Sequence, residues 1–159
     1  MLKKSGATED NCGKEIHLTV EISTSGHYRG LEQVRVNYTS FIELEENKTD
    51  EKQRHFLFNE SGKPIQLADL LTNGGDAALQ DPLHRAWNTH KGVEDTIRFS
   101  EKIPPVKNIH FTAAGLVFHY QPEDKPARSK MDAPQIFIPF TELTDVLKTD
   151  YLPENASAY

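Results

Sequence analysis

The chain has 159 residues and a formal net charge of −6, with 36% hydrophobic and 26% charged residues. This length and composition are typical of one globular domain that buries a core without disulfides or metal ions. The acidic balance argues against nucleic acid as a partner, because phosphates repel an acidic surface. No stretch approaches the roughly 18 apolar residues that a membrane span needs.

The N-terminal residues 1–14 are polar and contain no apolar h-region, so they are not a signal peptide as they stand. We expect a mobile leader over 1–14, a single domain over 15–153 and a C-terminal tail over 154–159. Cys12 is the only cysteine, which excludes a disulfide within one chain. Its place in the polar leader is typical of an exposed thiol and not of a catalytic one, which needs a pocket that lowers its pKa.

The first part of the domain predicts three strands. Residues 16–23, IHLTVEIS, alternate apolar and polar side chains, the pattern of a strand with one buried face. Residues 34–44 repeat the alternation after the turn-forming stretch SGHYRG, residues 25–30. The polar connector EENKTDEKQ, residues 45–53, is expected to be a loop. RHFLFNESGKPI, residues 54–65, predicts a third strand that ends in a Ser-Gly turn.

Two short helices are predicted in the middle of the chain. IQLADLLTNGG, residues 65–75, directs three leucines inward and stops at Asn-Gly-Gly. In DPLHRAWNTHKG, Asp81 is placed to cap a helix, Pro82 suits its first position and Gly92 its end. One face of this helix carries Leu83, Ala86, Trp87 and His90. Trp87 on that face is either a core anchor or a platform for a ligand.

The last third predicts a hairpin, another strand and a helix. Residues 108–112 and 116–121 are strands, and PQIFIPF, residues 134–140, is apolar on both faces and is expected to be a central strand. Thr141 can cap a helix over ELTDVLK with a buried stripe of Leu143, Val146 and Leu147. The order of elements predicts an α+β fold, an antiparallel sheet with short helices packed on one face.

The hairpin FTAAGLVFHYQP allows two registers. If Ala113 and Ala114 are the two loop residues, Phe111 faces Leu116, five large apolar residues share one side, and His110 and His119 share the other. If Gly115 is instead a left-handed bulge residue in a three-residue loop, the pairing shifts by one residue.

Two segments are candidate recognition sites. The loop of residues 121–134 is the most basic segment of an acidic chain, and connections of this length are often functional. Its cations are Lys125, Arg128 and Lys130. The turn SGHYRG places three further candidates at a tip, namely His27, Tyr28 and Arg29.

The sequence contains no motif for catalysis or for a cofactor. It lacks G-x-S-x-G, a P-loop, G-x-G-x-x-G and H-E-x-x-H, and its paired carboxylates lie outside apolar runs that would raise their pKa. The seven histidines form no ligand pattern, although His110 and His119 can approach across the hairpin in the first register. We therefore expect no metal ion, no cofactor and no enzyme activity.

Four segments, GKPIQLADLL, NIHFTAAGLVFHYQP, QIFIPFTEL and DYLP, together resemble one known domain family. They are similar to the RsiV-like domain, the extracytoplasmic part of lysozyme-sensing anti-sigma factors, which also occurs in bacterial envelope proteins. The resemblance covers roughly residues 15–153. It implies a periplasmic or other extracytoplasmic location, although the chain shows neither an export signal nor a membrane anchor.

Three hypotheses for the function follow. The first is a non-catalytic extracytoplasmic domain that binds a protein; the resemblance suggests lysozyme, and the acidic charge suits a cationic partner. If the domain inhibits lysozyme, a loop must enter a cleft whose chemistry uses two carboxylates. The second is a cytoplasmic regulatory or toxin-neutralising module. The third, disfavoured by the lack of catalytic residues, is an accessory domain of an enzyme that acts on peptidoglycan.

Overall fold

The computed structural model describes residues 16–42, 48–89, 102–104, 106–121 and 134–156. Its elements in chain order are β1 (Ile16–Tyr28), β2 (Leu31–Ile42), β3 (Lys48–Asn59), β4 (Pro64–Ile65), α1 (Leu67–Leu70), α2 (Gly75–Ala78), α3 (Gln80–Thr89), β5 (Ile109–Phe111), β6 (Gly115–His119), β7 (Gln135–Pro139) and the 3₁₀ turns η2 (Phe140–Glu142) and η3 (Thr149–Tyr151).

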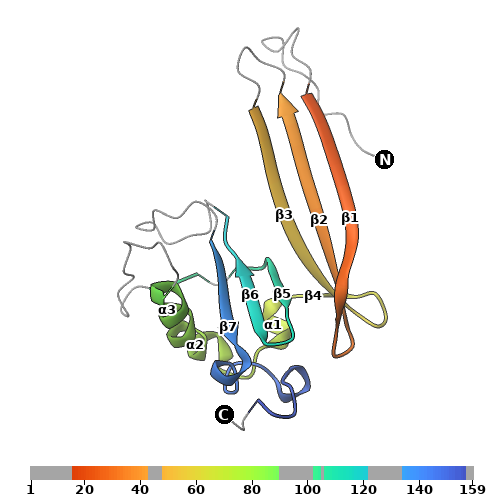
Figure 1. Ribbon diagram of the computed structural model, residues 1–159. Helices are drawn as coiled ribbons and strands as arrows, with labels where there is room; N and C mark the ends of the chain where they lie inside the picture. Colours follow the sequence, from red (N-terminus) through yellow and green to blue (C-terminus); the bar gives the residue numbers. More distant parts are fainter. Residues whose placement is uncertain (1–15, 43–47, 90–101, 105, 122–133, 157–159) are drawn as a thin grey trace.

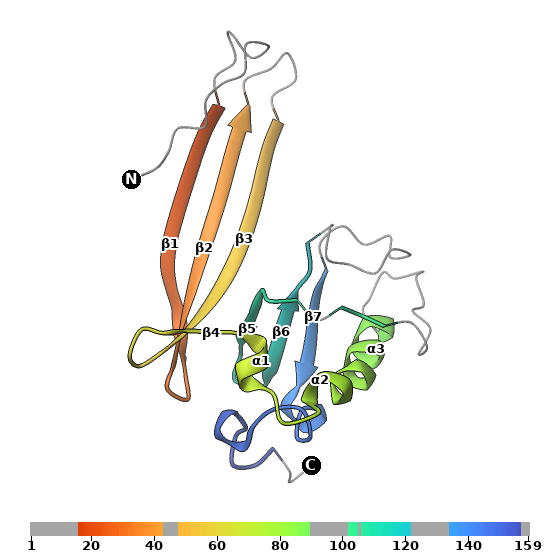
Figure 2. The same cartoon turned by 180° about the vertical axis from the view of Figure 1, so that it is seen from behind.

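The strands form two antiparallel sheets (Figure 1). β1, β2 and β3 make a long ribbon, here called the projecting sheet, and β4 pairs with the base of β3. The remaining elements form the body, which contains the second sheet in the order β5-β6-β7 and the helices. The view from behind shows the same separation (Figure 2). The prediction of an α+β fold with antiparallel strands and short helices is confirmed.

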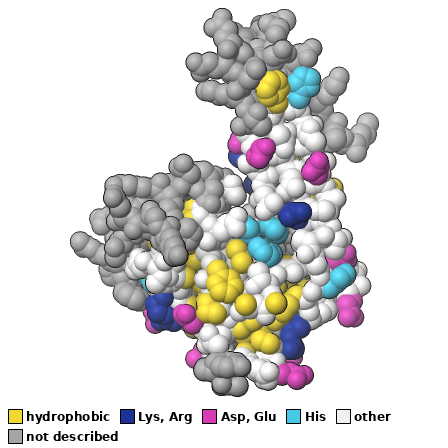
Figure 3. Space-filling model, viewed as in Figure 1, with side chains coloured by type: hydrophobic (Ala, Val, Ile, Leu, Met, Phe, Trp, Pro, Cys, Tyr) yellow, Lys and Arg dark blue, Asp and Glu magenta, His cyan; other side chains and the backbone are white. Residues whose placement is uncertain are grey.

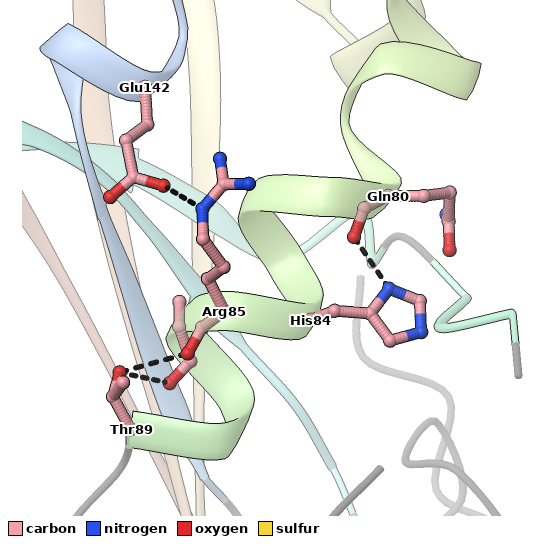
Figure 4. A network of polar contacts seen from close by, with 6 residues as sticks. Gln80, His84, Arg85, Thr89 and Glu142 are labelled. Atoms are coloured by element: carbon pink, nitrogen blue, oxygen red, sulfur yellow. Dashed lines mark hydrogen bonds and ion pairs between the residues drawn. The ribbon is translucent and has the colours of Figure 1, made fainter. Parts of the chain in front are cut away.

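The core lies in the body, between the second sheet, the helices and the C-terminal segment. Trp87 of α3 is fully buried, and its ring meets the Tyr120 ring edge-on with 4.9 Å between centroids, so it is a core residue. α3 packs against β7, and the Arg85 Nε donates to Glu142 Oε2 at 2.9 Å (Figure 4). α3 begins at Gln80, so Asp81 lies within its first turn instead of capping it.

The hairpin adopts the first of the two predicted registers. Ile109 pairs with Phe118 and Phe111 with Leu116. Gly115 is required by close packing and not by a bulge, since a Cβ there would lie 2.2 Å from the Ile138 carbonyl oxygen. β6 is the central strand, so the prediction of a central β7 is wrong. β7 is an edge strand whose Phe137 is 43% exposed.

The C-terminal segment corrects the prediction of a helix over residues 142–148. It forms η2 and further turns with a few local backbone hydrogen bonds, such as Leu147 N to Leu143 O. A continuous helix does not form, because other backbone groups pair with residues 70–72: Thr72 N donates to Val146 O and Lys148 N to Leu70 O, each at 2.9 Å. The predicted apolar stripe is nevertheless buried, with Leu143 and Leu147 fully enclosed.

The projecting sheet differs most from the sequence expectation. β3 begins at Lys48, so residues 48–53 are strand and not loop. Directly paired residues share a face, and the face that carries Leu18, Val20 and Ile22, here called the outer face, points away from the body. These side chains are 59%, 39% and 72% exposed, so the predicted buried face of β1 is wrong. An alternating pattern identifies an apolar face but not what covers it.

Two amide side chains join the projecting sheet to the body. Gln33 of β2, 5% exposed, donates from Nε2 to the Phe111 carbonyl at 3.0 Å and accepts from the Phe111 N–H at 2.6 Å. Asn108, just before β5, accepts from the His55 N–H at 2.7 Å and donates to the Gln53 carbonyl at 3.0 Å. Each amide therefore acts as a strand partner for backbone groups on the other sheet.

The Gln33 bridge can be tested by Gln33→Met, which keeps the volume and removes the amide. The Phe111 N–H and C=O would both remain buried without a partner, at about 1–3 kcal/mol for each group. We expect the free energy of unfolding to fall by about 2–4 kcal/mol in urea denaturation. Glu32→Met, at the exposed neighbouring position, is the control and should change it by less than about 0.5 kcal/mol. Equal effects of the two substitutions would contradict the bridge.

Candidate functional site

Of the six predicted binding residues, the structure describes the three in the turn between β1 and β2. Lys125, Arg128 and Lys130 lie outside the described residues. His27 and Arg29 are exposed at the tip between β1 and β2, where Arg29 has a left-handed backbone with φ of 43°. Their role in binding stays a prediction.

The side chain of Tyr28, the third predicted residue of this turn, packs against other residues of the protein. A register shift between Thr24 and Gly26 reverses the alternation of β1, so Tyr28 faces the body. Its ring stacks on Phe111 at 4.3 Å and on Phe140 at 5.6 Å, and its hydroxyl donates to the Tyr151 carbonyl at 2.8 Å. Burial raises the pKa of this hydroxyl. The side chain holds the base of β1 against the body.

Three histidines meet at the junction of the projecting sheet and the body. His55 comes from β3, His110 from β5 and His119 from β6. One ring nitrogen from each lies within 4.8 Å of those of the other two. The His55 ring stacks on His110 at 4.6 Å and on His119 at 4.3 Å, and His110 Nδ1 and His119 Nε2 are hydrogen-bonded at 2.7 Å. Histidine side chains form a visible patch at this junction (Figure 3).

Polar groups of the projecting sheet orient the His55 ring. The Gln53 Nε2 donates to Asn37 Oδ1 at 2.9 Å, which directs the Gln53 Oε1 toward His55. His55 Nε2 lies 3.1 Å from that oxygen and therefore carries the proton of the neutral ring. His55 Nδ1 is left as a buried acceptor without a hydrogen-bond partner among the described residues.

Burial keeps the cluster neutral. It is the main cause that lowers the pKa of His55 to about 3, with smaller contributions from His119, His110 and the Arg35 guanidinium. Burial and then His110 lower the pKa of His119 to about 4, and burial and then Arg35 lower that of His110. Neutral imidazoles keep a lone pair, so this group can accept a hydrogen bond, a proton or a metal ion.

The sequence alone does not reveal this cluster, because no motif or spacing assigns a role to His55. The hairpin register already placed His110 and His119 on one side. The third member could be found only from the pairing between the two sheets, and His55 lies 55 residues before His110 in the chain. Its sole local signal was a polar residue in an apolar strand segment, HFLF.

The outer face of the projecting sheet is a second candidate site. It carries an apolar stripe from β1, and Phe56 of β3 is 40% exposed on the same side. An open groove of about 440 Å³ runs over this face. Its lining residues are Leu18, Tyr38, Ser40, Asp50, Lys52, Arg54 and Phe56. Among the described residues, no strand pairs with the free edge of β1.

Comparison with known proteins identifies the fold. No family model and no curated protein matches the sequence. The structure is similar to a DUF3298 family member from Bacteroides fragilis, with a TM-score of 0.66 and 19% identity over 85% of this chain and 55% of that one. It is also similar to a DUF3298 protein from Pseudomonas aeruginosa, with a TM-score of 0.59 and 14% identity over 86% of this chain and 64% of that one.

These likenesses show that the chain has the fold of DUF3298 proteins, a domain family without a characterised function. The chain spans just over half of one neighbour and slightly under two thirds of the other. No helix in the described part of the chain is long and apolar enough to cross a membrane. The narrower resemblance to RsiV-like domains stays a prediction.

The histidine cluster predicts acid sensitivity. Because its pKa values lie below the unfolded value of about 6.5, the unfolded chain binds protons that the folded chain does not. The free energy of unfolding should hold steady above about pH 7 and fall as the pH drops from about 6.5 to about 3.

The measurement is urea denaturation across this pH range with a chelator present. The slope of the free energy of unfolding against pH reports how many more protons the unfolded chain binds than the folded chain. His55→Gln should lower this number by up to about one. His27→Gln, at the exposed turn, should leave the slope unchanged. A slope that is the same in all three proteins would contradict the role of the cluster.

Proposed function

We propose that this chain is a non-catalytic, extracytoplasmic protein-binding domain of a bacterial envelope protein, with lysozyme as its partner. The observation that carries the proposal is the outer face of the projecting sheet. Every second side chain of β1 from Leu18 to Ile22 is apolar and exposed on this face, and large exposed apolar patches in soluble proteins often mark binding surfaces. The sheet extends this surface away from the body (Figure 1).

β1 offers two kinds of contact to a partner. Its free edge can pair with an extended segment through backbone hydrogen bonds, and the neighbouring apolar side chains supply specificity. The groove beside it, which contains Tyr38 and Phe56, can receive an apolar or aromatic anchor. An aromatic residue at the centre of a protein interface often contributes much of the binding free energy.

The net charge of −6 favours a cationic partner, because it accelerates the encounter with a basic protein and slows that with an acidic one. Lysozyme, as a cationic protein, is a partner of the kind that this acidic chain favours. The resemblance of the hairpin and the QIFIPFTEL segment to RsiV-like domains points to the same partner and to the outside of the cytoplasm. The DUF3298 fold is compatible with this proposal and does not by itself identify a ligand.

The lack of catalytic activity is part of the proposal. The buried polar side chains of the described residues are Gln33, His55, His84 and His119, with no carboxylate among them. A general acid at neutral pH needs a carboxyl group whose pKa is raised by burial. The histidine cluster has no serine or cysteine among its hydrogen-bond partners described above, so it is not arranged to activate a nucleophile.

The proposal can be tested by calorimetric titration of the chain with c-type lysozyme at low and at physiological salt, while lytic activity is followed in parallel. The double variant Leu18→Lys, Ile22→Lys places two cations on the outer face. It should weaken binding at least about tenfold, because like charges repel and two apolar contacts are lost.

The matched control is Thr19→Lys, Ser23→Lys, which makes the same charge change on the opposite face of β1. This control also weakens the long-range attraction to a cationic partner, an effect that salt screens and that the two salt concentrations therefore measure. Apart from that effect, it should change the affinity by less than about threefold. No heat with lysozyme would overturn the choice of partner. Equal weakening by both double variants would overturn the outer face as the binding surface, and so would self-association that the outer-face variant abolishes.

A further inference from the structure

The His55 Nδ1 atom has no hydrogen-bond partner among the described residues although it is buried. The large majority of buried side-chain polar atoms in folded proteins have such a partner, and each exception calls for an explanation. Here the atom belongs to His55, a residue that is 7% exposed and whose ring stacks on two further imidazoles. A buried, unpaired imidazole nitrogen beside two further histidines is a candidate metal ligand, because a neutral imidazole binds a metal through such a lone pair.

We propose that His55, His110 and His119 bind one divalent transition-metal ion, with Zn²⁺ the best match, and that this ion fastens the projecting sheet to the body. Nothing in the proposed protein-binding function requires this site, and the two can fail independently. The ligands come from both parts of the molecule, so the ion would stabilise their docked arrangement.

The distances allow three imidazoles to reach one ion with small movements. Zn–N bonds of about 2.0–2.1 Å in a tetrahedral site place two ligand nitrogens about 3.4 Å apart. The three nitrogens lie within 4.8 Å of one another, so no pair has to close by more than about 1.4 Å. An imidazole binds a metal in the plane of its ring, so His55 must turn out of its stack. The His110–His119 hydrogen bond would give way to two metal bonds.

The surroundings supply the support that histidine ligands need. A ligating histidine usually donates its other ring N–H to an oxygen that fixes its tautomer. The Gln53 Oε1, held by Asn37, is placed to accept from His55 Nε2 and so leaves Nδ1 for the metal. Asn108 fixes the His55 backbone by accepting from its N–H.

The ligand set determines the class of metal. Imidazole nitrogen suits Zn²⁺, Cu²⁺ and Ni²⁺, whereas Mg²⁺ and Ca²⁺ prefer oxygen ligands. Three histidines leave a fourth position for water or another ligand. His110 is only partly buried, and the histidine patch is visible at the surface, so an ion can enter from solvent (Figure 3).

Arg35 provides an internal test of the site. It lies directly opposite His55 on β2, and its charge acts on both His55 and His110. A fixed positive charge beside the cluster repels a cation. Removing it should therefore strengthen metal binding, whereas a purely structural change would not.

The experiment is a calorimetric titration of the EDTA-stripped full chain with ZnCl₂ at neutral pH, repeated with Co²⁺ to record the absorption spectrum of the bound ion. We expect one ion per chain and a tetrahedral Co²⁺ spectrum. His110→Ala and His119→Ala should each weaken binding at least about 100-fold, more than the 10–100-fold effect of losing a ligand's supporting partner. Arg35→Gln should tighten it about 3–10-fold.

Matched controls separate this site from adventitious binding. His17→Ala and His27→Ala remove exposed histidines elsewhere, and Arg54→Gln removes a cation from the opposite face of the sheet. All three should leave the affinity within about twofold. Circular dichroism with EDTA shows whether each variant still folds. If His110→Ala does not fold, His110→Asn takes its place, because His110 is the most exposed of the three positions. Absence of zinc binding, or binding that the cluster variants and the controls affect alike, would overturn the proposal.

Discussion

The exchange of amide hydrogen bonds between the two sheets is the constraint on which the rest of the structure depends. A sheet edge leaves backbone groups unpaired, and burying them without partners costs free energy. Here the Gln33 amide satisfies Phe111 on the outer edge of β5, and the Asn108 amide satisfies Gln53 and His55 on β3. Because each amide donates one of these bonds and accepts the other, it imitates a strand residue and fixes the register of one sheet against the other.

That register determines what each end of the projecting sheet can do. At its base, the exchange brings His55 over the hairpin histidines, and the bulge in β1 turns Tyr28 toward Phe111. On the opposite, outer face, which points away from the body, the same ribbon exposes Leu18 and Ile22. One ribbon thus combines a buried polar junction with an exposed apolar surface, and the two candidate sites are consequences of one packing arrangement.

The parts of the fold that could be predicted are those with local causes. Of the two hairpin registers that the sequence allows, the structure has the one in which two alanines form the loop and the apolar side chains gather. Helical spacing puts Trp87 and Leu147 on apolar faces, and both are buried, although Leu147 does not lie in a helix. The predictions that are wrong concern what a segment packs against or hydrogen-bonds to elsewhere in the chain. β1 has the alternation of a half-buried strand but no cover in the described residues, and ELTDVLK has the stripe of a helix but bonds to the α1 segment. The histidine cluster was missed for the same reason, since only sheet-to-sheet pairing brings His55 to His110.

The two sites act on different equilibria, and this separates their effects. A ligand shifts an equilibrium only by its differential affinity for the two states. An ion held by His55, His110 and His119 distinguishes the docked sheet from the undocked one, so it bears on stability. A partner on the outer face touches β1 and the groove beside Phe56, which are present whether or not the ion is bound. The ion therefore changes affinity for a partner only if that partner also contacts the body, because only then does the angle between sheet and body enter the binding free energy.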